Sequence, residues 1–340
     1  KPKAGLSIYM TNYNIYGIGA ALVDTEVEVS DAFLSSANID KGVMTLVDED
    51  RQFELLAALA SGSHKMDRKC GGSVCNSVVA ASSLGAKAFF SGKVADDSDG
   101  QLYIDDLQEA GVDFHGAGQE SGITGKCLVM VTDDAERTMN TFLGASEDLS
   151  AREIDQAALV DSEWFYVEGY LVTDEARTAA TKAAVELAKA KGVKVAVSLS
   201  DPFVVSVFGD SLRQVIGDGV DLIFCNKDEA TAFTGTETLE AASEALKQYT
   251  KTFAITDGAK GAITFDGTSL EQSEGVKAKA IDTNGAGDMF AGAFLYGITA
   301  GKNYGWAADL ANDCAAKVVA RFGPRLDPND FTLVKQRFGI

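Results

Sequence analysis

The sequence of 340 residues has few cysteines, few histidines and no long apolar run. Its five cysteines form no Cys-x-x-Cys pair and no even-numbered set, which is typical of buried or inert thiols in a reducing compartment, so structural disulfides are not expected. Its two histidines, His64 and His115, lie apart from other candidate catalytic groups, so Ser-His-Asp hydrolysis and histidine-based zinc sites have little support. No run approaches the ~18 uninterrupted apolar residues of a transmembrane helix, and the first residues lack the apolar stretch of a signal peptide, so we expect a cytoplasmic protein.

Basic residues are also few for the number of acidic ones. Lys and Arg together number 30 and Asp and Glu number 50, which gives a formal net charge of −20 at pH 7. This balance disfavours a stable complex with nucleic acid or an anionic membrane, because both of these partners are themselves negatively charged. We therefore expect small-molecule partners, although the acidity alone is also typical of an adaptation for solubility, including solubility in salt.

Two common nucleotide-binding motifs are missing. The chain has no Gly-x-x-x-x-Gly-Lys-Ser/Thr segment, which argues against a P-loop ATPase. It also has no Gly-x-Gly-x-x-Gly segment that is followed about 20 positions later by an acidic residue in a first βαβ unit. An NAD-dependent dehydrogenase is therefore not favoured either.

The pattern of apolar residues, which make up 46% of the chain, indicates the fold class. Strand-like runs alternate with helical periodicity along the whole chain, and the clearest runs are 193–198, 222–225 and 253–256. One helix is expected between Asp174 and a C-terminal cap at Gly192. The alternation predicts an α/β fold with a predominantly parallel sheet flanked by helices.

Two stretches, residues 25–50 and 112–145, do not follow this alternation. In the second, residues 126–132 and the segment after them have the pattern of paired strands with no helix between them. We expect a small β-sheet that is inserted into one unit of residues 1–340 and acts as a lid, excluding water from a reaction site. The alternative is an ordinary antiparallel edge of the main sheet.

The strongest motif is Asp-Thr-Asn-Gly-Ala-Gly-Asp at 282–288, just before and within a predicted helix over 286–298. Gly285 and Gly287 allow backbone N–H groups to approach a phosphate closely, and the positive end of the helix dipole favours its charge. Asp288, in the first helical turn, can accept the proton of a substrate hydroxyl that attacks a γ-phosphorus. The alternative is a capped helix after a tight turn, with an aspartate that complements the dipole.

The length of this motif makes it specific, and the chain from about residue 14 to 328 resembles the ribokinase-like (PfkB) family of carbohydrate and nucleoside kinases, adenosine kinases above all. The resemblance rests on six segments in the order typical of the family: 17–24, 71–76, 92–97, 198–203, 226–229 and 282–288. It implies a Rossmann-like domain with a small β-lid, and transfer of the ATP γ-phosphoryl group to a hydroxymethyl group. It also implies that Asp288 is the base and that the N–H groups of Gly285, Ala286, Gly287 and Asp288 form an anion hole.

The resemblance further implies a set of residues that hold the acceptor. Asp24 is expected at the end of the first apolar strand, where open α/β sheets place ligand groups, and would take two adjacent ring hydroxyls. Gly72, Ser73 and Asn76 would hold the same sugar, with Asn76 offering both a donor and an acceptor. The alternative for these three is a turn and cap before a packing helix over 73–84. Tyr170 would stack on a purine, although a tyrosine after a core strand is as often a packing residue.

The remaining implied residues concern ATP and its metal ion. Arg137 resembles the arginine that clamps the transferring phosphate. Asn226 and Glu229 match a motif that acts on Mg²⁺ through water or phosphate, and the alternative is a helix N-cap with a favourable glutamate in the first turn. Residues expected along the nucleotide are Thr256, Gly258, Gly261, Asn312 and Ala316, of which the last two could equally belong to a plain packing helix.

Two departures from the family pattern leave the acceptor open. Position 20 is Ala where adenosine kinases generally carry Asn, and position 95 is Ala where Gly is usual. We expect a kinase acting on the 5′-hydroxyl of adenosine or a close relative. A ribose-like or other free-sugar kinase, and a non-catalytic nucleotide or nucleoside sensor, are the alternatives. The oligomeric state, monomer or homodimer, and activation by a monovalent cation such as K⁺ stay open.

Overall fold

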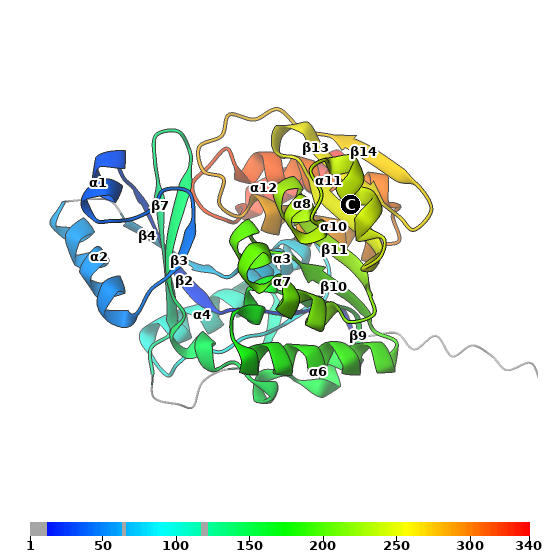
Figure 1. Cartoon of the computed structure of the whole chain (residues 1–340), viewed down its shortest axis with the longest axis horizontal. Coiled ribbons are helices and arrows are strands. Elements are labelled where there is room, and N and C mark those ends of the chain that lie inside the picture. Colours follow the sequence, from blue (N-terminus) through cyan, green and yellow to red (C-terminus); the bar gives the residue numbers. More distant parts are fainter. Residues whose placement is uncertain (1–11, 63–65, 117–121) are drawn as a thin grey trace, which may run out of the picture.

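The computed structural model describes residues 12–62, 66–116 and 122–340, and a nine-stranded sheet forms its centre (Figure 1). Its strand order is β14-β13-β12-β11-β10-β9-β1-β5-β6. Seven neighbouring strands run parallel: β1 (Tyr13–Ile18), β5 (Ala88–Ser91), β6 (Val112–His115), β9 (Ser162–Val167), β10 (Lys194–Ser198), β11 (Val220–Asn226) and β12 (Thr250–Thr256). An antiparallel edge is formed by β13 (Gly261–Phe265) and β14 (Leu270–Glu274). The predicted α/β class with a mostly parallel sheet is confirmed.

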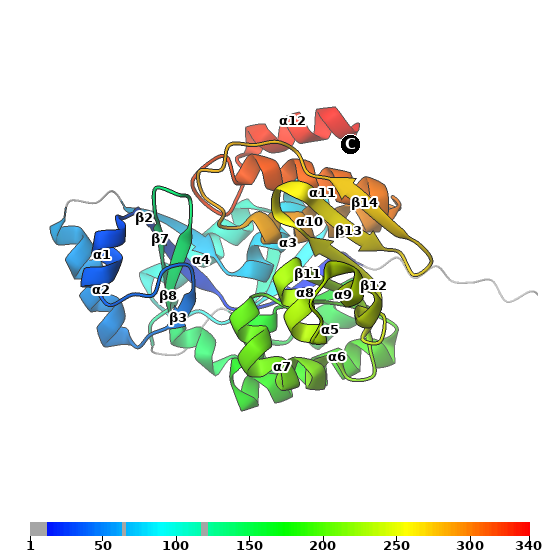
Figure 2. The same ribbon diagram turned by 45° about the horizontal axis from the view of Figure 1, so that its top comes forward.

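Helices cover both faces of this sheet (Figure 2). One layer contains α3 (Ser73–Leu84), α4 (Ser98–Glu109), α10 (Ala286–Thr299), α11 (Tyr304–Val318) and α12 (Pro328–Phe338). The other contains α5 (Gln156–Val160), α6 (Glu175–Lys191), α7 (Pro202–Ile216), α8 (Lys227–Thr234) and α9 (Leu239–Leu246). Neighbouring residues on a strand enter opposite cores, as Ile15 and Tyr16 do, because side chains of a strand alternate between its faces.

Local signals fix several of these helices. Asp174 accepts hydrogen bonds from the first backbone N–H groups of α6, and Gly192 ends that helix with a left-handed φ of 79°. Both were expected from the sequence and are confirmed. The boundaries predicted for the helix over 73–84 are those of α3. Short 3₁₀ helices occupy Gly144–Asp148, Ala151–Glu153, Gly169–Thr173 and Gly258–Lys260.

A second, five-stranded sheet lies at one side of the main sheet, with the order β3-β8-β7-β2-β4. It consists of β2 (Leu22–Glu28), β3 (Met44–Leu46), β4 (Met66–Gly71), β7 (Gly125–Val131) and β8 (Arg137–Phe142). One of its faces packs against α1 (Asp31–Ser36) and α2 (Glu49–Ser61), at the left of Figure 1, through a small core that includes Leu34, Leu55 and Leu128. The other face is turned towards the main sheet.

The second sheet has different bounds from the two ranges expected for a lid. The pairing of residues 126–132 with the next segment is confirmed, because β7 and β8 are antiparallel neighbours. However, β6 at 112–115 pairs with β5 in the main sheet, and β4, outside both ranges, pairs with β2. The reason is that β4 has the sequence Met-Asp-Arg-Lys-Cys-Gly, whose charged residues hide its strand character until a partner strand is present.

The sequence also predicts Asp24 at the end of the first apolar strand, and this prediction is wrong. β1 ends at Ile18, and the chain leaves the main sheet before β2 begins at Leu22, so Asp24 lies within the second sheet. A Cβ atom at Gly19 would come within 2.4 Å of Oε2 of Glu168, so the crossing requires a glycine there. Residues 18–23, which join the two strands, are all glycine or apolar, and this hides the break between the strands.

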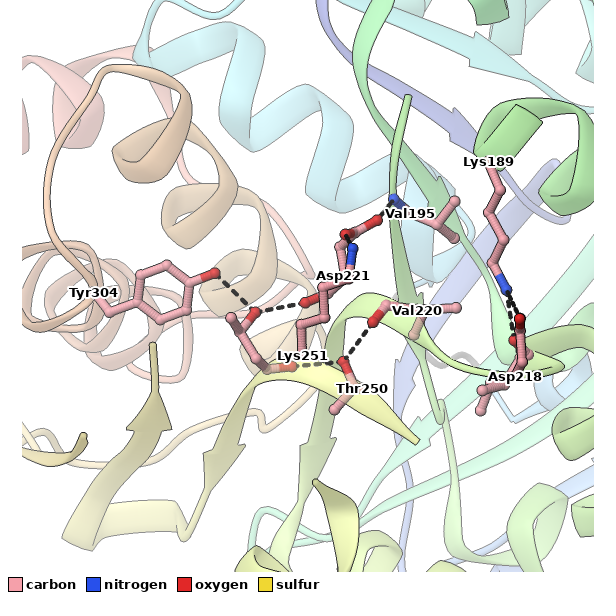
Figure 3. Close-up of polar contacts among 10 residues, drawn as sticks. Lys189, Val195, Asp218, Val220, Asp221, Thr250, Lys251 and Tyr304 are labelled. Atoms are coloured by element: carbon pink, nitrogen blue, oxygen red, sulfur yellow. Dashed lines mark hydrogen bonds and ion pairs between the residues drawn. The ribbon is translucent and has the colours of Figure 1, made fainter. Parts of the chain in front are cut away.

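Side chains at the amino-terminal ends of β10, β11 and β12 tie the strands together (Figure 3). Asp221 accepts hydrogen bonds from the backbone N–H of Val195 at 2.8 Å and from Lys251 at 2.7 Å. Thr252 is bonded to the hydroxyl of Tyr304 on α11 at 2.8 Å. These contacts stabilise the end of the sheet away from the candidate site.

Two further expectations concern the chain as a whole. All five cysteines are buried and unpaired, as predicted. Within the described ranges, no helix has the length and apolar character needed to cross a membrane.

Candidate active site

Two adjoining cavities lie between the second sheet and the carboxyl ends of the main parallel strands, where open α/β sheets bind ligands. The inter-sheet cavity is lined by strands of the second sheet, the start of α3 and the segment 168–173, and has an empty volume of about 740 Å³ including its mouth. The strand-end cavity is lined by the ends of β10, β11 and β12 and the start of α10. Four residues line both cavities: Ser73, Arg137, Ser200 and Asp288.

Asp288 lies in the first turn of α10, on the wall that the two cavities share. The Ser73 hydroxyl donates to its Oδ1 at 2.6 Å, and the Asn76 amide donates to its Oδ2 at 2.9 Å. Burial raises the pKa of Asp288 above the ordinary aspartate value, while these two hydrogen bonds act in the opposite direction. The carboxylate is thus held by α3 at the boundary between the two cavities.

The segment before Asp288 is shaped for close approach to a ligand. Gly285 has a φ of 74°, and a Cβ atom there would come within 2.4 Å of Pro324, so only glycine fits. A Cβ atom at Gly287 would meet nothing within 4 Å, which leaves its backbone open to the strand-end cavity. Gly285, Ala286 and Gly287 all line this cavity, and the first N–H groups of a helix lack partners within it, so they can bind an anion. The Ala286 N–H also donates a long hydrogen bond, of 3.4 Å, to the Thr283 carbonyl oxygen.

All the residues expected to hold the acceptor line the inter-sheet cavity: Asp24, Gly72, Ser73, Asn76 and Tyr170. Asp24 is 6% exposed, and burial raises the pKa of its carboxyl group well above the usual value. A Cβ atom at Gly71 would come within 2.2 Å of that carboxylate, so the glycine leaves room for it. One donor and one acceptor of Asn76 are already used, by Asp288 and by Nε of Arg325 at 2.8 Å.

Sequence reasoning missed most of the apolar lining of this cavity. Apolar side chains come from β2, β3 and β8 and the residue after β8: Leu22, Met44, Leu46, Met139 and Leu143. Residues that lie opposite one another on neighbouring strands form a row across the sheet: Asp24 on β2, Cys127 on β7, Thr141 on β8 and Leu46 on β3. At the usual strand spacing, about 14 Å separates β2 from β3. The lining therefore changes across the sheet from a carboxylate to Met and Leu side chains.

Glu168 was also missed as a lining residue. Its side chain is 1% exposed, and its two oxygens accept from the backbone N–H groups of Ala20 at 3.1 Å and Val74 at 3.0 Å. Burial raises the pKa of Glu168 to about 7. Its position directly after β9 was the available signal, because ligand groups gather at the carboxyl ends of parallel strands.

Asn226 and Glu229 line the strand-end cavity and at the same time cap α8. Asn226 Oδ1 accepts from the backbone N–H of Glu229 at 2.8 Å, and Glu229 accepts from the backbone and the amide of Asn226 at 3.0 and 2.6 Å. Burial raises the pKa of Glu229 to about 7. Since these oxygens are already engaged and the described ranges hold no cluster of three or more His, Cys, Asp or Glu suited to a metal, the pair fits Mg²⁺ only through water or phosphate.

The residues expected along the nucleotide are only partly brought together. Thr256 and Gly258 line the strand-end cavity, whereas Gly261, Asn312 and Ala316 line neither cavity. The Asn312 amide instead donates to Ser273 Oγ at 2.8 Å and to nearby carbonyls, which ties α11 to β14. The packing alternative accounts for this residue.

Arg137 links the second sheet to the segment 282–288. It begins β8, and its guanidinium donates to Asn284 Oδ1 at 3.0 Å. Asn284 in turn donates to Glu26 of β2 at 3.3 Å, and Glu26 accepts from Lys69 at 3.4 Å. Arg137 thus reaches both cavities from the second sheet.

The two departures from the family pattern lie in different places. Ala20 lines the inter-sheet cavity beside the Glu168 carboxyl group, so a polar group is present near this position. Ala95 lies outside both cavities, and its backbone N–H donates to Thr124 Oγ1 at 3.0 Å. Of the two positions, only residue 20 lies at the wall of the candidate site. Of the two histidines, His115 is exposed at the end of β6 and His64 lies outside the described residues.

Comparisons with known proteins agree with this arrangement. A family model described as "pfkB family carbohydrate kinase" matches residues 39–330. The chain is 28% identical to adenosine kinase of Saccharomyces cerevisiae over 334 residues, 90% of this chain and 95% of that protein. It is 29% identical to ribokinase of Haemophilus influenzae, covering 74% of this chain and 82% of that one.

Solved structures give the same result. Adenosine kinase from Sinorhizobium meliloti superposes with a TM-score of 0.89 at 32% identity, covering 96% of this chain and 99% of that one. A probable sugar kinase from Rhizobium etli gives a TM-score of 0.91 at 30% identity, covering 97% of this chain and 100% of that one.

Proposed function

The chain belongs to the pfkB family of carbohydrate kinases, which are phosphotransferases acting on hydroxyl groups, and we propose that it transfers the γ-phosphoryl group of ATP to the 5′-hydroxyl of adenosine or a close relative. The proposal goes beyond the family because both adenosine kinases and sugar kinases are similar to this chain.

The observation that supports a nucleoside is the change in lining across the inter-sheet cavity. A nucleoside carries a polar ribose and a flat base whose two faces are apolar. Asp24 and Asn76 offer polar contacts next to Asp288, whereas Met44 and Leu46 on β3 offer an apolar surface about 14 Å across the sheet. Met139 on β8, one strand nearer, extends this surface. A free sugar has no apolar part that would use this second region.

In the proposed reaction the acceptor hydroxyl lies beside Asp288 and the phosphates of ATP extend from the strand-end cavity. The hydroxyl oxygen bonds to the γ-phosphorus, the bond between that phosphorus and the bridging oxygen of ADP breaks, and the hydroxyl proton moves to Asp288. The N–H groups of Gly285, Ala286 and Gly287, together with Arg137, stabilise the charge on the transferring group. Mg²⁺ would neutralise phosphate charge, held indirectly by Asn226 and Glu229.

The lid role of the second sheet is part of this proposal. The sheet supplies one wall of the inter-sheet cavity and brings Arg137 to the segment 282–288. Enclosure of the acceptor between the two sheets would keep water from competing for the phosphoryl group.

The test is an ATP-consumption assay with Mg²⁺ on a panel of adenosine, inosine, guanosine, cytidine, ribose, fructose and fructose 6-phosphate, with the phosphorylated product identified by mass. Turnover of a purine nucleoside far above that of the sugars supports the proposal. Turnover of a free sugar alone would favour the second candidate, a free-sugar kinase, which the similarity to ribokinase supports. No turnover of any acceptor would favour a nucleotide or nucleoside sensor.

A further inference from the structure

A segment between α11 and α12, residues 323–325, touches the candidate site at three places. The backbone N–H of Gly323 donates to Oδ2 of Asp282 at 3.1 Å. Pro324 packs directly against Gly285. Arg325 reaches Asn76 on α3. The segment therefore connects the loop before α10 with the helix that holds Asp288.

Arg325 is the side chain of this segment that reaches furthest into the molecule. Its side chain is 15% exposed. Nε donates to Asn76 Oδ1 at 2.8 Å, Nη1 donates to Asp106 at 2.5 Å, and Nη2 contacts the sulfur of Cys75 at 3.4 Å. The planar guanidinium is thus fixed at several nitrogens, and Asp106 balances its charge.

The contact with Asn76 determines which way the amide of that residue points. A guanidinium can only donate hydrogen bonds, so the end of the amide that faces Arg325 must be the oxygen. The NH₂ group then faces Asp288 and donates to Oδ2 at 2.9 Å. If the amide were reversed, its oxygen would face a carboxylate, which cannot donate a hydrogen bond when ionised.

We propose that Arg325 is a positioning residue for phosphoryl transfer: it holds the oxygen of Asn76 so that the NH₂ group of the amide donates to the Asp288 carboxylate and holds it against the attacking hydroxyl. The proposal rests on the proposed function, in which Asp288 is the base. Arg325 acts through Asn76 and contacts neither cavity as a lining residue.

Its positive charge has a second, measurable effect. Arg325 lowers the pKa of Asp288, against the larger effect of burial, which raises it. Loss of the arginine is therefore expected to move the acidic limb of the kcat profile to higher pH. Other ionisable groups that face Asp288 are Arg137 of β8, Asp24 of β2, Tyr166 of β9 and Glu168.

The experiment compares Arg325→Met and Arg325→Lys with the wild-type protein, using the best acceptor of the panel. We expect Arg325→Met to lower kcat by about 10- to 100-fold, the scale of a misplaced reacting group, with little change in the KM for ATP. Its acidic limb should move to higher pH. Arg325→Lys should keep the limb near its wild-type position but still lose kcat, because one ammonium group cannot reproduce the guanidinium geometry.

A matched control is Arg321→Met. Arg321 lies in the same connection, pairs with Asp327 and Asp330, and lines neither cavity. It should leave kcat unchanged. An equal loss of kcat in Arg321→Met would overturn the proposal, because the connection would then act only as a structural support.

A double-mutant cycle separates positioning from general damage. If Arg325 acts through Asp288, Arg325→Met should cause little further loss in an Asp288→Asn background. Two results would overturn the role of Arg325 and leave the proposed function standing. One is a double variant whose loss of kcat equals the combined losses of the two single variants. The other is an Arg325→Met variant with wild-type kcat and an unshifted acidic limb of the kcat profile. Absence of turnover in the wild-type protein would instead overturn the proposed function. If Arg325→Met does not fold, the same double-mutant cycle is carried out with Arg325→Lys, alone and combined with Asp288→Asn.

Discussion

Asp288 and Glu168 both line the inter-sheet cavity, but the hydrogen bonds that they accept are different. Both oxygens of Glu168 are held by backbone N–H groups, at Ala20 and Val74, which suits a residue that fixes the loop after β1 against the start of α3. Asp288 is held by the side chains of Ser73 and Asn76 at the wall between the two cavities. The second arrangement suits the proposed base, because Asp288 lines both the cavity proposed for the acceptor and the cavity proposed for the phosphates.

Replacement of Asp288 by asparagine tests its role as the base. Asp288→Asn keeps the shape of the side chain but removes its ability to accept a proton. We expect binding of ATP and acceptor to persist and kcat to fall by roughly 10²- to 10⁴-fold, the range for loss of a general base. Steady-state kinetics with calorimetric binding would measure both, and turnover within a few-fold of wild type would show that another group is the base.

The raised pKa of Glu168 predicts that the free energy of unfolding depends on pH. Its pKa is raised from 4.5 to about 7 in the folded state, so between these values the folded protein binds more protons than the unfolded chain. Stability from this residue is therefore greatest below about pH 4.5 and falls as the pH rises to about 7. Glu168→Gln cannot ionise, so the stability of the wild-type protein relative to this variant should fall by up to about 3 kcal/mol over that window.

Denaturant unfolding of the wild-type protein and Glu168→Gln at pH 5, 6, 7 and 8 measures this difference. Glu153→Gln is a suitable control, because Glu153 is also buried but caps a short 3₁₀ helix at residues 151–153. A difference between the wild-type protein and Glu168→Gln that stays constant with pH would contradict the assignment.

The two faces of the second sheet have different roles. Its strands β2, β7 and β8 have one face against α1, α2 and their small core, and the other towards the inter-sheet cavity. The edge strand β3 contributes Met44 and Leu46 to the cavity, while Thr45 between them is exposed on the opposite face. Because side chains alternate along a strand, neighbouring positions on β3 give a matched pair for mutation.

Met44→Ala is expected to weaken nucleoside binding without affecting the chemistry. The variant removes apolar contact from the region about three strands away from Asp24, so the KM for a nucleoside should rise by about tenfold while kcat changes little. The KM for ribose, if ribose is turned over, should not change. Thr45→Ala should leave all of these values as in the wild-type protein. An unchanged nucleoside KM in Met44→Ala would show that the base does not lie against β3.

At the scale of the whole molecule, the chain carries a net charge of −20 and its site lies where the two sheets meet. Mutual repulsion of so many like charges destabilises a compact state, and dissolved salt screens it. Ion pairs such as Lys41 with Asp31 and Asp134 lie on the surface and contribute little to stability. Screening of these pairs by salt therefore costs little stability.

Stability should therefore increase with ionic strength. We expect the midpoint of thermal unfolding to rise by a few degrees between low and about 0.5 M salt, since about 1 kcal/mol moves the midpoint by some 2–4 °C in a large domain. KCl and NaCl should act equally if screening is the only cause. A larger rise in KCl would indicate a bound monovalent cation, and a fall in both salts would contradict net repulsion.

The sequence by itself determined the features that depend on near neighbours. The caps of α6, the boundaries of α3 and the glycines before Asp288 follow from helical periodicity, capping chemistry and backbone freedom, all of which act within a few residues. Alternation of strand-like and helical segments was enough to predict the α/β class. The motif 282–288 also located the candidate base.

Tertiary structure decided what depends on the pairing of distant segments. Asp24 belongs to the second sheet because β2 pairs with β4 and β7, and the apolar part of the cavity forms because β8 pairs with β3. Arg325 reaches Asn76 across 249 positions of the chain, and no local pattern marks that contact. The physical reason is that periodicity tells which residues share a face, whereas only the packing of the complete chain decides which faces meet.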